Sequence, residues 1–571
     1  MAITHSDYSK ARIICEEAAR NLAEALYPDN RGGRSMDPLI LIVGLFLTMD
    51  KYNAQYLTKV YEVLTRDLPL VDQWHLGVRS QGEKVGQVKV LCINDLYQLS
   101  KRITGQLDFS QARASQLQKQ VRHQRRECLD QFVSDMLSKT LPKRPEGSID
   151  YALDGTGIWA SEKGKARRKK DLLPELCHEE LMDANDSIKP NVLLSESLEL
   201  DEENPKAPIK SGRGCRGASD ARWGYKTSKN GESEKYFGYD IETMTRVPKI
   251  RTQDGETRLE PALIETLVVI PASVNMVNPC LRMIDRLIGR GKKVGSLLVD
   301  RHYSHKKYVT WATELMKRDI AQVIDLREDD QGFRDWSGMK IAASWAHCPS
   351  TPNRLGEIVT LGPKPTEEAR DLFIAKIQER QAYAAQRISP LSADGKIRFS
   401  CPARNGTIGC PLREGTVATA ITFGLPVVDN PPGEVGRPAI CTQETVQLRV
   451  ESEAEQISMK LNQKHYWGSQ AWRLSYNRRT YVEGTFGVFK STTATGHDRG
   501  THQFQGLPLV TIAVAVSAAV TNLRLLRKWN DETGLGDPLD PLLAPDPEFH
   551  GLQELSFEDA QAIDQEFLVR K

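Results

Sequence analysis

The chain has 571 residues, of which 40% are hydrophobic and 27% are charged, and its net charge is +2. This length predicts more than one domain, and this composition is that of an ordinary soluble protein rather than a disordered or fibrous one. The small net charge conceals an asymmetry, because residues 531–571 hold eleven acidic residues against two basic ones, a net of −9, which leaves +11 on residues 1–530. A basic body with an acidic tail is compatible with a polyanionic partner.

The N-terminus has no apolar core of the kind that signal peptides carry. The longest apolar run, residues 507–520, is too short and too rich in alanine to span a bilayer comfortably. The ten cysteines are scattered along the chain. We therefore expect a cytoplasmic protein with reduced thiols and no membrane partner.

Residues 1–145 are predicted to form an all-helical N-terminal region. Helical spacing of apolar residues covers 6–28, 38–69, 93–103 and 109–137. The last of these segments carries a cationic face composed of Lys119, Arg122, Arg125 and Arg126. We interpret the region as a DNA-binding module with this face as its contact surface, and a role in assembly alone is the alternative.

The period changes at Ser148, where apolar and polar residues begin to alternate. Strands are predicted at 148–160, 236–243, 263–271, 294–300 and 320–326, with helices at 280–290 and 304–317. This order over residues 146–326 predicts an α/β fold, a mixed sheet flanked by helices. Within it, residues 161–234 are polar and glycine-rich and form a predicted basic surface excursion. Its run at 163–170 holds six cations and is either solvated or in contact with a DNA backbone.

Two aspartates of this predicted sheet lie where functional residues of α/β proteins are often found. Asp154 follows the first strand and precedes Gly155-Thr156-Gly157, and Asp300 ends a short apolar strand. A carboxylate at the carboxyl end of a buried strand lies at the rim of the sheet, where the sites of α/β proteins are found.

Residues 327–454 are predicted to be a β-rich insertion. Strand-like runs occur at 339–345, 357–361, 396–400, 417–423 and 445–450, and one helix is predicted at 366–388. The insertion contains four cysteines in turn-like settings, namely Cys348, Cys401, Cys410 and Cys441. Three of them precede a proline, but their spacing is not that of a zinc motif, so free thiols and a structural zinc site both stay open.

Residues 455–530 return to helical patterns. A helix at 476–490 would place Tyr476, Arg479, Glu483 and Lys490 on one narrow stripe. Residues 507–526 are apolar almost all round, which predicts a buried helix on the sheet. The acidic tail, 531–571, is loop-rich with a weak helix near 557–568.

Asp154, Asp300 and Glu483 together are the carboxylate set that a two-metal site needs. Hard oxygen ligands suit Mg²⁺ or Mn²⁺, and two such ions can act on one phosphodiester. Arg479 and Lys490 would steer DNA phosphates, and Tyr476 would donate a hydrogen bond or stack near the substrate.

These motifs resemble those of a DDE transposase of a bacterial insertion sequence. The spacing Y-x2-R-x3-E-x6-K at Tyr476, Arg479, Glu483 and Lys490 is similar to the signature of one branch of that family. LDGTG around Asp154 and LLVDRHY around Asp300 look like its first and second acid motifs. The resemblance covers residues 148–330 and 455–528.

The resemblance implies an RNase H-like core, with an insertion before the last catalytic acid, and metal-dependent DNA cleavage and strand transfer. It implies double-stranded DNA as the partner, both as terminal inverted repeats and as target, and a homodimer or larger assembly in the bacterial cytoplasm, on the nucleoid when DNA is bound. A domesticated DNA-binding protein that no longer cuts and an RNase H-like nuclease without joining activity are the alternatives.

Some transposases of this branch stack a flipped base on a tryptophan of the insertion. Trp336, Trp345, Trp467 and Trp472 are the residues of this chain that invite the comparison, although core packing is the simpler role for each. His302 and His305 follow Asp300 and would either tune a metal site or begin a helix.

Overall fold

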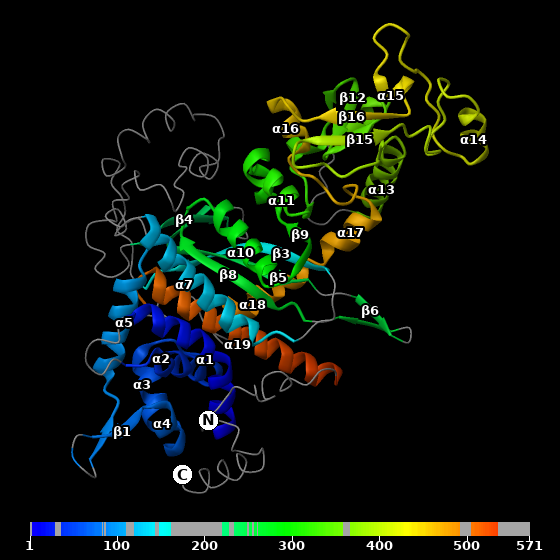
Figure 1. The fold of residues 1–571 in the computed structure, drawn as a ribbon. Coiled ribbons are helices and arrows are strands. Elements are labelled where there is room, and N and C mark those ends of the chain that lie inside the picture. The colour runs from blue at the N-terminus through cyan, green and yellow to red at the C-terminus, as the bar shows by residue number, and fades with distance from the viewer. Residues whose placement is uncertain are drawn as a thin grey trace. The chain divides into compact units, whose positions relative to one another are not determined.

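The computed structural model describes residues 3–28, 36–82, 84, 87–109, 119–142, 148–161, 220–227, 233–247, 250–253, 256–259, 261–357, 366–490 and 504–534. Contacts divide the chain into two compact units. Unit 1 comprises Met1–Glu146, Gly155–Met283 and Tyr481–Lys571, and unit 2 comprises Gly147–Asp154 and Ile284–Thr480. The fold is mixed α/β (Figure 1), as predicted, whereas the division into five regions stays a prediction.

Helices at the start of unit 1 match most of the predicted periodic segments. They are α1 (His5–Leu26), α2 (Pro38–Tyr52), α3 (Leu57–Glu62), a π-helical turn η1 (Val63–Asp67), α4 (Leu70–Leu76), α5 (Ile93–Leu107) and α7 (Lys119–Ser138). A capping box of Thr4 and Asp7 begins α1. Asp37 caps α2, and Pro38 occupies its first turn, where the missing N–H costs nothing. Local sequence signals therefore set these two helix starts.

The N-terminal region is not entirely helical, so that prediction is wrong. A small antiparallel hairpin of β1 (Arg79–Gln81) and β2 (Val88–Val90) lies between α4 and α5 in the chain. Strands of three residues are too short for alternation to reveal them in a sequence.

Two of the four residues in the predicted cationic face of α7 are not exposed, and the side chain of Lys119 lies outside what the structure describes. Arg122 and Arg126 are buried. Arg125 donates a hydrogen bond from Nη1 to the carbonyl of Asp108 at 2.9 Å. The long aliphatic stems of arginine let such residues pack inside a fold, which a count of charges does not reveal. DNA binding by this region stays a prediction without this surface to support it.

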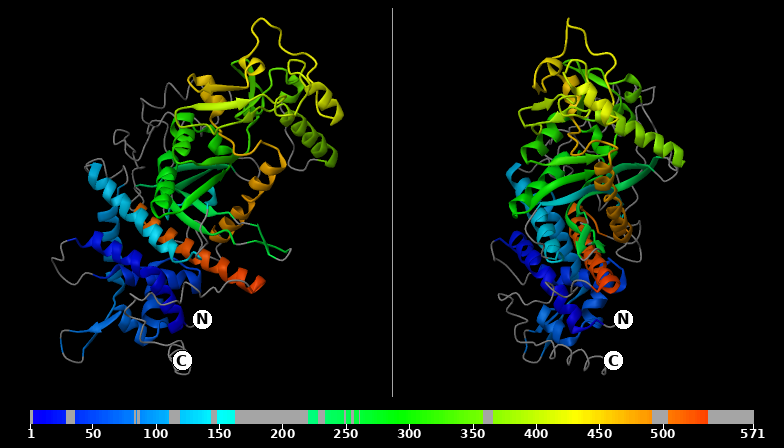
Figure 2. Two further views of the ribbon diagram at one scale, coloured as in Figure 1. Left: turned by 45° about the vertical axis from the view of Figure 1, so that its right-hand side comes forward. Right: turned by 90° about the vertical axis from the view of Figure 1, so that its right-hand side faces the viewer.

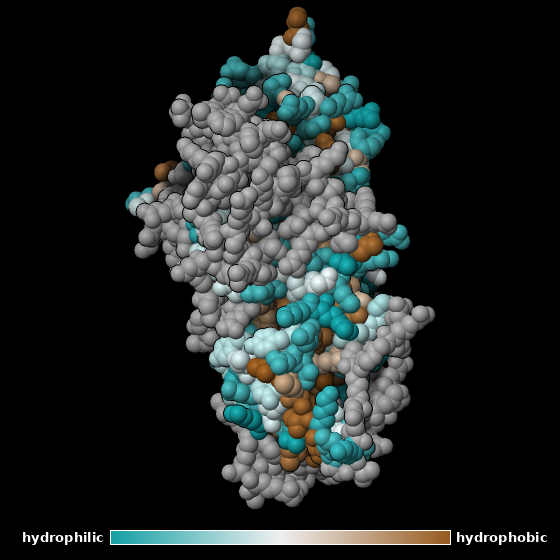
Figure 3. All heavy atoms as spheres, turned by 90° about the vertical axis from the view of Figure 1, so that its left-hand side faces the viewer, coloured by the Kyte–Doolittle hydropathy of each residue, from teal (hydrophilic) through white to brown (hydrophobic). Residues whose placement is uncertain are grey.

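Several apolar side chains of the same region reach the surface. They are Tyr56, Leu70, Val71, Trp74, Val88, Val90 and Tyr97. Three of these residues share the short helix α4 and make one exposed apolar strip. Figure 3 shows apolar residues among hydrophilic ones in the lower half of the face that it presents.

The main sheet has the hydrogen-bonded order β10-β9-β3-β5-β4, and β8 also pairs with β5. Its strands are β3 (Ser148–Trp159), β4 (Arg222–Thr227), β5 (Ser233–Arg246), β8 (Ile264–Pro271), β9 (Lys293–Val299) and β10 (Ala321–Ile324). β3, β9 and β10 run parallel, whereas β5 is antiparallel to β4 and β8. Strand β3 runs from unit 2 into unit 1 after Asp154. The sheet is therefore mixed, as predicted.

Part of the predicted surface excursion is a strand of this sheet. Residues 222–227 form β4, whose Trp223 and Tyr225 have the aromatic character that suits a strand. Residues 162–219 and 228–232 of that excursion, which include the basic run 163–170, lie outside the described residues. A separate hairpin is formed by β6 (Ile250–Gln253) and β7 (Glu256–Leu259).

Two long helices of unit 1 cover β8. These are α7 and α19 (Leu507–Thr533), which contact each other and run side by side (Figure 2). Within the described part of the chain, α19 is the helix long and apolar enough to cross a membrane, yet 89% of that window is buried inside the fold. We therefore describe it as a core helix, as predicted.

Asn522 of α19 joins this helix to the beginning of β8. Its Nδ2 donates to the carbonyl of Ile264 at 2.8 Å, and its Oδ1 accepts from the N–H of Ile264 at 2.9 Å. Asn522 is fully buried. Among the described strands β8 pairs only with β5, so this amide satisfies backbone groups that would otherwise need another partner.

The segments between the strands of unit 2 are irregular. The predicted helix at 304–317 is a 3₁₀ turn η3 (Arg301–His305), a π turn η4 (Tyr308–Ala312) and a short helix α11 (Thr313–Lys317). The helix predicted at 280–290 is α10 (Val277–Gly289). Helices α16 (Glu453–Met459), α17 (Gln470–Asn477) and α18 (Thr480–Lys490) follow the insertion, and α18 belongs to unit 1.

The insertion at 327–454 consists mostly of short strands, turns and short helices. Two three-stranded antiparallel sheets lie in it, β11-β12-β13 and β14-β15-β16. The strands are β11 (Arg334–Trp336), β12 (Met339–Ala342), β13 (Trp345–His347), β14 (Gln386–Arg387), β15 (Lys396–Ser400) and β16 (Thr445–Arg449). The helical segments are α12 (Glu328–Gln331), η5 (Asn353–Gly356), α13 (Glu367–Ala382), α14 (Thr416–Thr422) and α15 (Ala439–Thr442).

One strand predicted in the insertion is a helix. Residues 417–423 have β-branched side chains, yet the chain forms α14 there. Gly415 adopts a positive φ of 74° before the helix, and Ala418 and Ala420 favour helical backbone. A strand also needs a hydrogen-bonded neighbour, and none of the described strands pairs with these residues. The strand predicted at 357–361 lies outside the described residues from 358 onward.

Candidate functional site

Two of the predicted acidic residues lie at adjacent positions on neighbouring strands of the main sheet. In the parallel pairing of β3 with β9, Leu153 is opposite Val299. The next residues along the two strands are Asp154 and Asp300. β9 ends at Val299, whereas β3 continues to Trp159, so the prediction that Asp154 follows its strand is wrong. The parallel register alone places these two aspartates next to each other.

Two successive arginines form ion pairs with two aspartates of β3. Arg479 Nη1 lies 3.4 Å from Asp154 Oδ2, and Arg478 Nη2 lies 2.8 Å from Asp150 Oδ2. The four side chains are between 17% and 19% exposed, so these pairs are only partly screened by water. The paired arginines therefore fix the chain after α17 against β3.

Asp150 and Arg478 were missed by sequence reasoning. Burial would raise the pKa of Asp150, but hydrogen bonds from Ser296 and Arg478 outweigh it and lower that pKa. Ser296 Oγ donates to Asp150 Oδ1 at 2.6 Å. The available signal was Asp150 four residues before Asp154 on one strand, together with the Arg478-Arg479 pair.

The environment of Asp300 leaves its negative charge only partly compensated. Burial raises the pKa of Asp300, while a hydrogen bond from the backbone N–H of His302 and the charge of Arg479 oppose that rise. The His302 bond is 2.8 Å long and caps the turn η3. One guanidinium thus acts on Asp154 and Asp300 together, an arrangement that favours a further cation.

The predicted single helix over 476–490 is wrong. Helix α17 ends at Asn477, and α18 begins at Thr480. Arg478 and Arg479 lie in the turn between them, where the Arg479 N–H donates to the carbonyl of Tyr476 at 2.9 Å. Neighbours on a helix point about 100° apart. The turn instead lets both arginines reach β3.

Tyr476 is held by aromatic packing within unit 2. Its ring stacks on Trp472 with centroids 4.8 Å apart and an interplanar angle of 10°. The Arg479 guanidinium lies 5.6 Å from the centroid of the Tyr476 ring. Burial raises the pKa of Tyr476 to about 12, so the phenol keeps its proton at neutral pH and can donate a hydrogen bond.

Glu483 and Lys490 lie on α18, in unit 1. Glu483 is exposed in the first turn of this helix. Lys490 is the last residue of α18, and its side chain lies outside what the structure describes. Since Asp154 and Asp300 belong to unit 2, the role of Glu483 as the third acid stays a prediction.

Asp325 is a third aspartate at the same edge that sequence reasoning missed. In the pairing of β10 with β9, Ile324 is opposite Val299, so Asp325 is level with Asp300 in the register. Its carboxylate accepts a hydrogen bond from Trp467 Nε1 at 3.1 Å and one from Arg301 Nε at 2.6 Å. The available signal was an apolar strand followed by Asp, as at the end of β9.

The glycines after Asp154 have a steric reason. A side chain at Gly155 would collide with Glu242, and one at Gly157 would collide with Tyr236. Both partners lie on β5, so the LDGTG motif allows this strand to pack closely.

The tryptophans compared with base-stacking residues are mainly part of the core. Trp336, Trp467 and Trp472 are buried. Trp472 Nε1 donates to the carbonyl of Ile324 at 3.2 Å. Trp345 is half-buried, and the Arg387 guanidinium lies 4.0 Å from the centroid of its ring. These contacts fix the tryptophans to β10 and to the insertion.

His302 and His305 lie in the turn η3 rather than at the start of a regular helix. Burial lowers the pKa of each to about 4, so both imidazoles are neutral near pH 7. Within the described residues no group of three or more His, Cys, Asp or Glu side chains is arranged to hold a metal ion as it stands. The predicted metal ligands therefore stay predictions.

Comparisons of this chain with family models, with curated proteins and with solved structures give no match. The function of this chain must therefore be inferred from its own residues and their geometry.

Proposed function

We propose that this protein is a DNA transposase of the DDE class, with an RNase H-like core, that cleaves DNA at transposon ends and joins them to target DNA. The observation that carries the proposal is the register of Leu153 with Val299, which sets Asp154 and Asp300 side by side. Arg479, in the turn before Glu483, pairs with Asp154.

Asp154 and Asp300 fit a divalent cation by their chemistry. Carboxylate oxygens are the ligands that Mg²⁺ and Mn²⁺ prefer, and the raised pKa of Asp300 marks a buried charge that a cation would stabilise. In this proposal Asp154, Asp300 and Glu483 would bind two divalent metal ions. When bound, such ions activate a water or 3′-hydroxyl and stabilise the leaving oxygen.

Arg479 and Tyr476 have distinct tasks in this proposal. Arg479 balances the charge of Asp154 in the free protein and would pair with a DNA phosphate in the complex, where a guanidinium can bind two oxygens. Tyr476 keeps its phenolic proton and would donate a hydrogen bond to a phosphate oxygen. Lys490 would add a point charge toward the backbone.

The partner in this proposal is double-stranded DNA, as terminal inverted repeats and as target. Strand transfer needs two DNA ends at once, so the active form would be a homodimer or a larger assembly on DNA. A cytoplasmic location on the nucleoid follows from the same proposal.

The test is a strand-transfer assay with the full chain, Mg²⁺ and labelled duplexes from the DNA that flanks its reading frame. We expect cleaved ends and joined products with Mg²⁺ and none with EDTA. Asp154→Asn should lose both activities while DNA binding in a mobility-shift assay persists.

Asp319→Asn is the matched control, because Asp319 is exposed, precedes β10 at the opposite end of that strand, and has a φ of 57° that asparagine tolerates. Hydrolysis without joined products would favour the nuclease alternative. DNA binding without any cleavage would favour the domesticated protein, and full activity of Asp154→Asn would refute the site.

A further inference from the structure

Three cysteines of the insertion begin turns of the same form. Each is followed by proline, and the carbonyl of each accepts a hydrogen bond from the N–H three residues later. These bonds are Thr351 N to Cys348 O at 3.0 Å, Arg404 N to Cys401 O at 3.1 Å, and Arg413 N to Cys410 O at 2.9 Å. Proline at the second position of a turn fixes φ in advance, so the turns position these cysteines rigidly.

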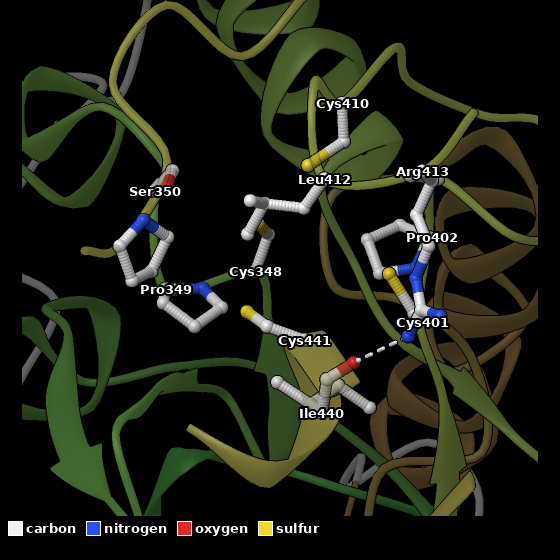
Figure 4. Close-up of a pocket in the computed structure, with 12 residues that line it drawn as sticks. Cys348, Pro349, Ser350, Cys401, Pro402, Cys410, Leu412, Arg413, Ile440 and Cys441 are labelled. Atoms are coloured by element: carbon white, nitrogen blue, oxygen red, sulfur yellow. Dashed lines mark hydrogen bonds between the residues drawn. The ribbon is translucent and has the colours of Figure 1, made fainter. Parts of the chain in front are cut away.

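The turns bring their thiols to one place, together with that of Cys441. All four cysteines line a single hollow in the insertion (Figure 4), although they come from segments far apart in the chain. Cys348, Cys401 and Cys410 are buried, and Cys441, on α15, is half-buried.

Arg413 lines the same hollow as the four cysteines. Arg413 is itself held by the Gln443 carbonyl at 2.7 Å and contacts that of Ile440, the bond drawn in Figure 4.

We propose that Cys348, Cys401, Cys410 and Cys441 bind one structural zinc ion. Four cysteine thiolates in tetrahedral geometry are a common structural zinc site. As the thiols stand, no metal-holding group is formed among the described residues, so binding requires the cysteine side chains to turn toward a common centre and release their protons. The ion would link the segments that carry the four cysteines, which do not belong to one common sheet.

The zinc inference does not depend on the proposed function. Its test is the metal content of the full-length protein, purified without added metal or chelator and measured by inductively coupled plasma mass spectrometry. We expect about one zinc per chain in the wild type. Cys401→Ser and Cys410→Ser should reduce it to near zero, and Cys280→Ser, a buried cysteine on α10, should keep it.

A measurement on the wild type guards against variants that fail to fold. Titration of the native protein with an organomercurial thiol reagent should release the zinc in step with modification, and Co²⁺ in its place should give the visible absorption of a tetrahedral thiolate site. A protein without zinc whose four thiols react freely would overturn the proposal. So would iron in place of zinc, a disulfide among the four, or zinc retained by both ligand variants.

Discussion

The sheet edge and the insertion place potential metal ligands by different means. At the sheet edge, Asp154, Asp300 and Asp325 follow residues that are level in the ladders of β3, β9 and β10, so hydrogen-bonded register alone fixes their spacing. In the insertion, Cys348 and Cys401 begin proline turns and belong to no common ladder. Register therefore places side chains of neighbouring strands in a row, whereas turns can bring together residues from separate segments of the chain.

The largest effect on the cleavage rate is expected at Asp300, and it tests the difference between the sheet and the insertion. Asp300→Asn removes a carboxylate charge from the proposed metal site, so the transition state should lose several kcal/mol of stabilisation. The cleavage rate should therefore fall by roughly 10³-fold or more. Asp325→Asn should stay within about tenfold, because that carboxylate already serves Arg301 and Trp467. Single-turnover cleavage rates measure both. Equal losses in the two variants would mean that the position in the register, and not the set of partners of each carboxylate, decides the role of the residue.

Arg479 offers the second largest effect. Arg479→Ala should slow cleavage by about 10- to 100-fold, the worth of one or two charge-assisted hydrogen bonds. Arg479→Lys should recover part of it, because the charge returns without the planar fork. The matched control is Arg398→Ala, an exposed arginine on β15. If the Arg479→Ala variant cleaved DNA at the wild-type rate, Arg479 would not be part of the site.

A smaller effect on stability is expected where α17 is tied to β3. Arg478→Ala breaks the partly buried pair with Asp150 and should cost about 1–3 kcal/mol of unfolding free energy. Arg301→Ala, whose side chain is 66% exposed, should cost less than about 1 kcal/mol. Urea unfolding followed by tryptophan fluorescence compares the two, since Trp467 and Trp472 lie in the same unit. An equal cost for both variants would contradict the anchoring role of Arg478.

The remaining prediction concerns the pH dependence of stability at a buried hydrogen-bond network between the insertion and Tyr466. His347 donates from Nδ1 to the carbonyl of Lys340 at 3.0 Å and accepts from the Tyr466 hydroxyl at 2.7 Å. Arg380 Nε donates to the same hydroxyl at 2.9 Å. This chain of bonds uses the neutral imidazole, and burial lowers the pKa of His347 to about 3.

The sign of the pH effect follows from this lowered pKa. The unfolded state takes up a proton on His347 below about pH 6.5, and the folded state does so only near pH 3, so stability falls as pH drops between those values. The slope from this residue is at most about 1.4 kcal/mol per pH unit. In the His347→Gln variant, the urea midpoint of unfolding should depend less on pH between pH 6 and pH 4.5 than in the wild type. His302 and His305 are present in both proteins, so they do not contribute to the difference. An unchanged slope would contradict the assignment.

The sequence predicted elements whose signals are local. The alternation at 148–160, the apolar strand before Asp300 and the buried helix at 507–526 all appear close to the predicted bounds. It failed where a distant partner decides the structure. Residues 417–423 have strand propensity but no neighbouring strand, and Arg122 and Arg126 are charged yet buried.

The candidate site divides in the same way. The parallel register of β3 with β9 brings Asp154 and Asp300 together, but the prediction that Asp154 follows its strand was wrong, because β3 continues to Trp159. The break of the helix at Arg478 and Arg479 was not predictable from helical spacing, since it depends on ion pairs with aspartates more than three hundred residues earlier in the chain. Asp325 was visible in the sequence as a third apolar strand that ends in aspartate, and only its alignment with the others was not.

The contact between Asn522 and Ile264 has a consequence for aggregation. A strand with unpaired backbone groups is a template on which another chain can add a strand. The buried amide of Asn522 occupies both the N–H and the carbonyl of Ile264, so at this point β8 offers a second molecule nothing to pair with. One side chain on a helix thus acts as a cap on an open sheet edge and helps to keep the folded chain apart from its copies.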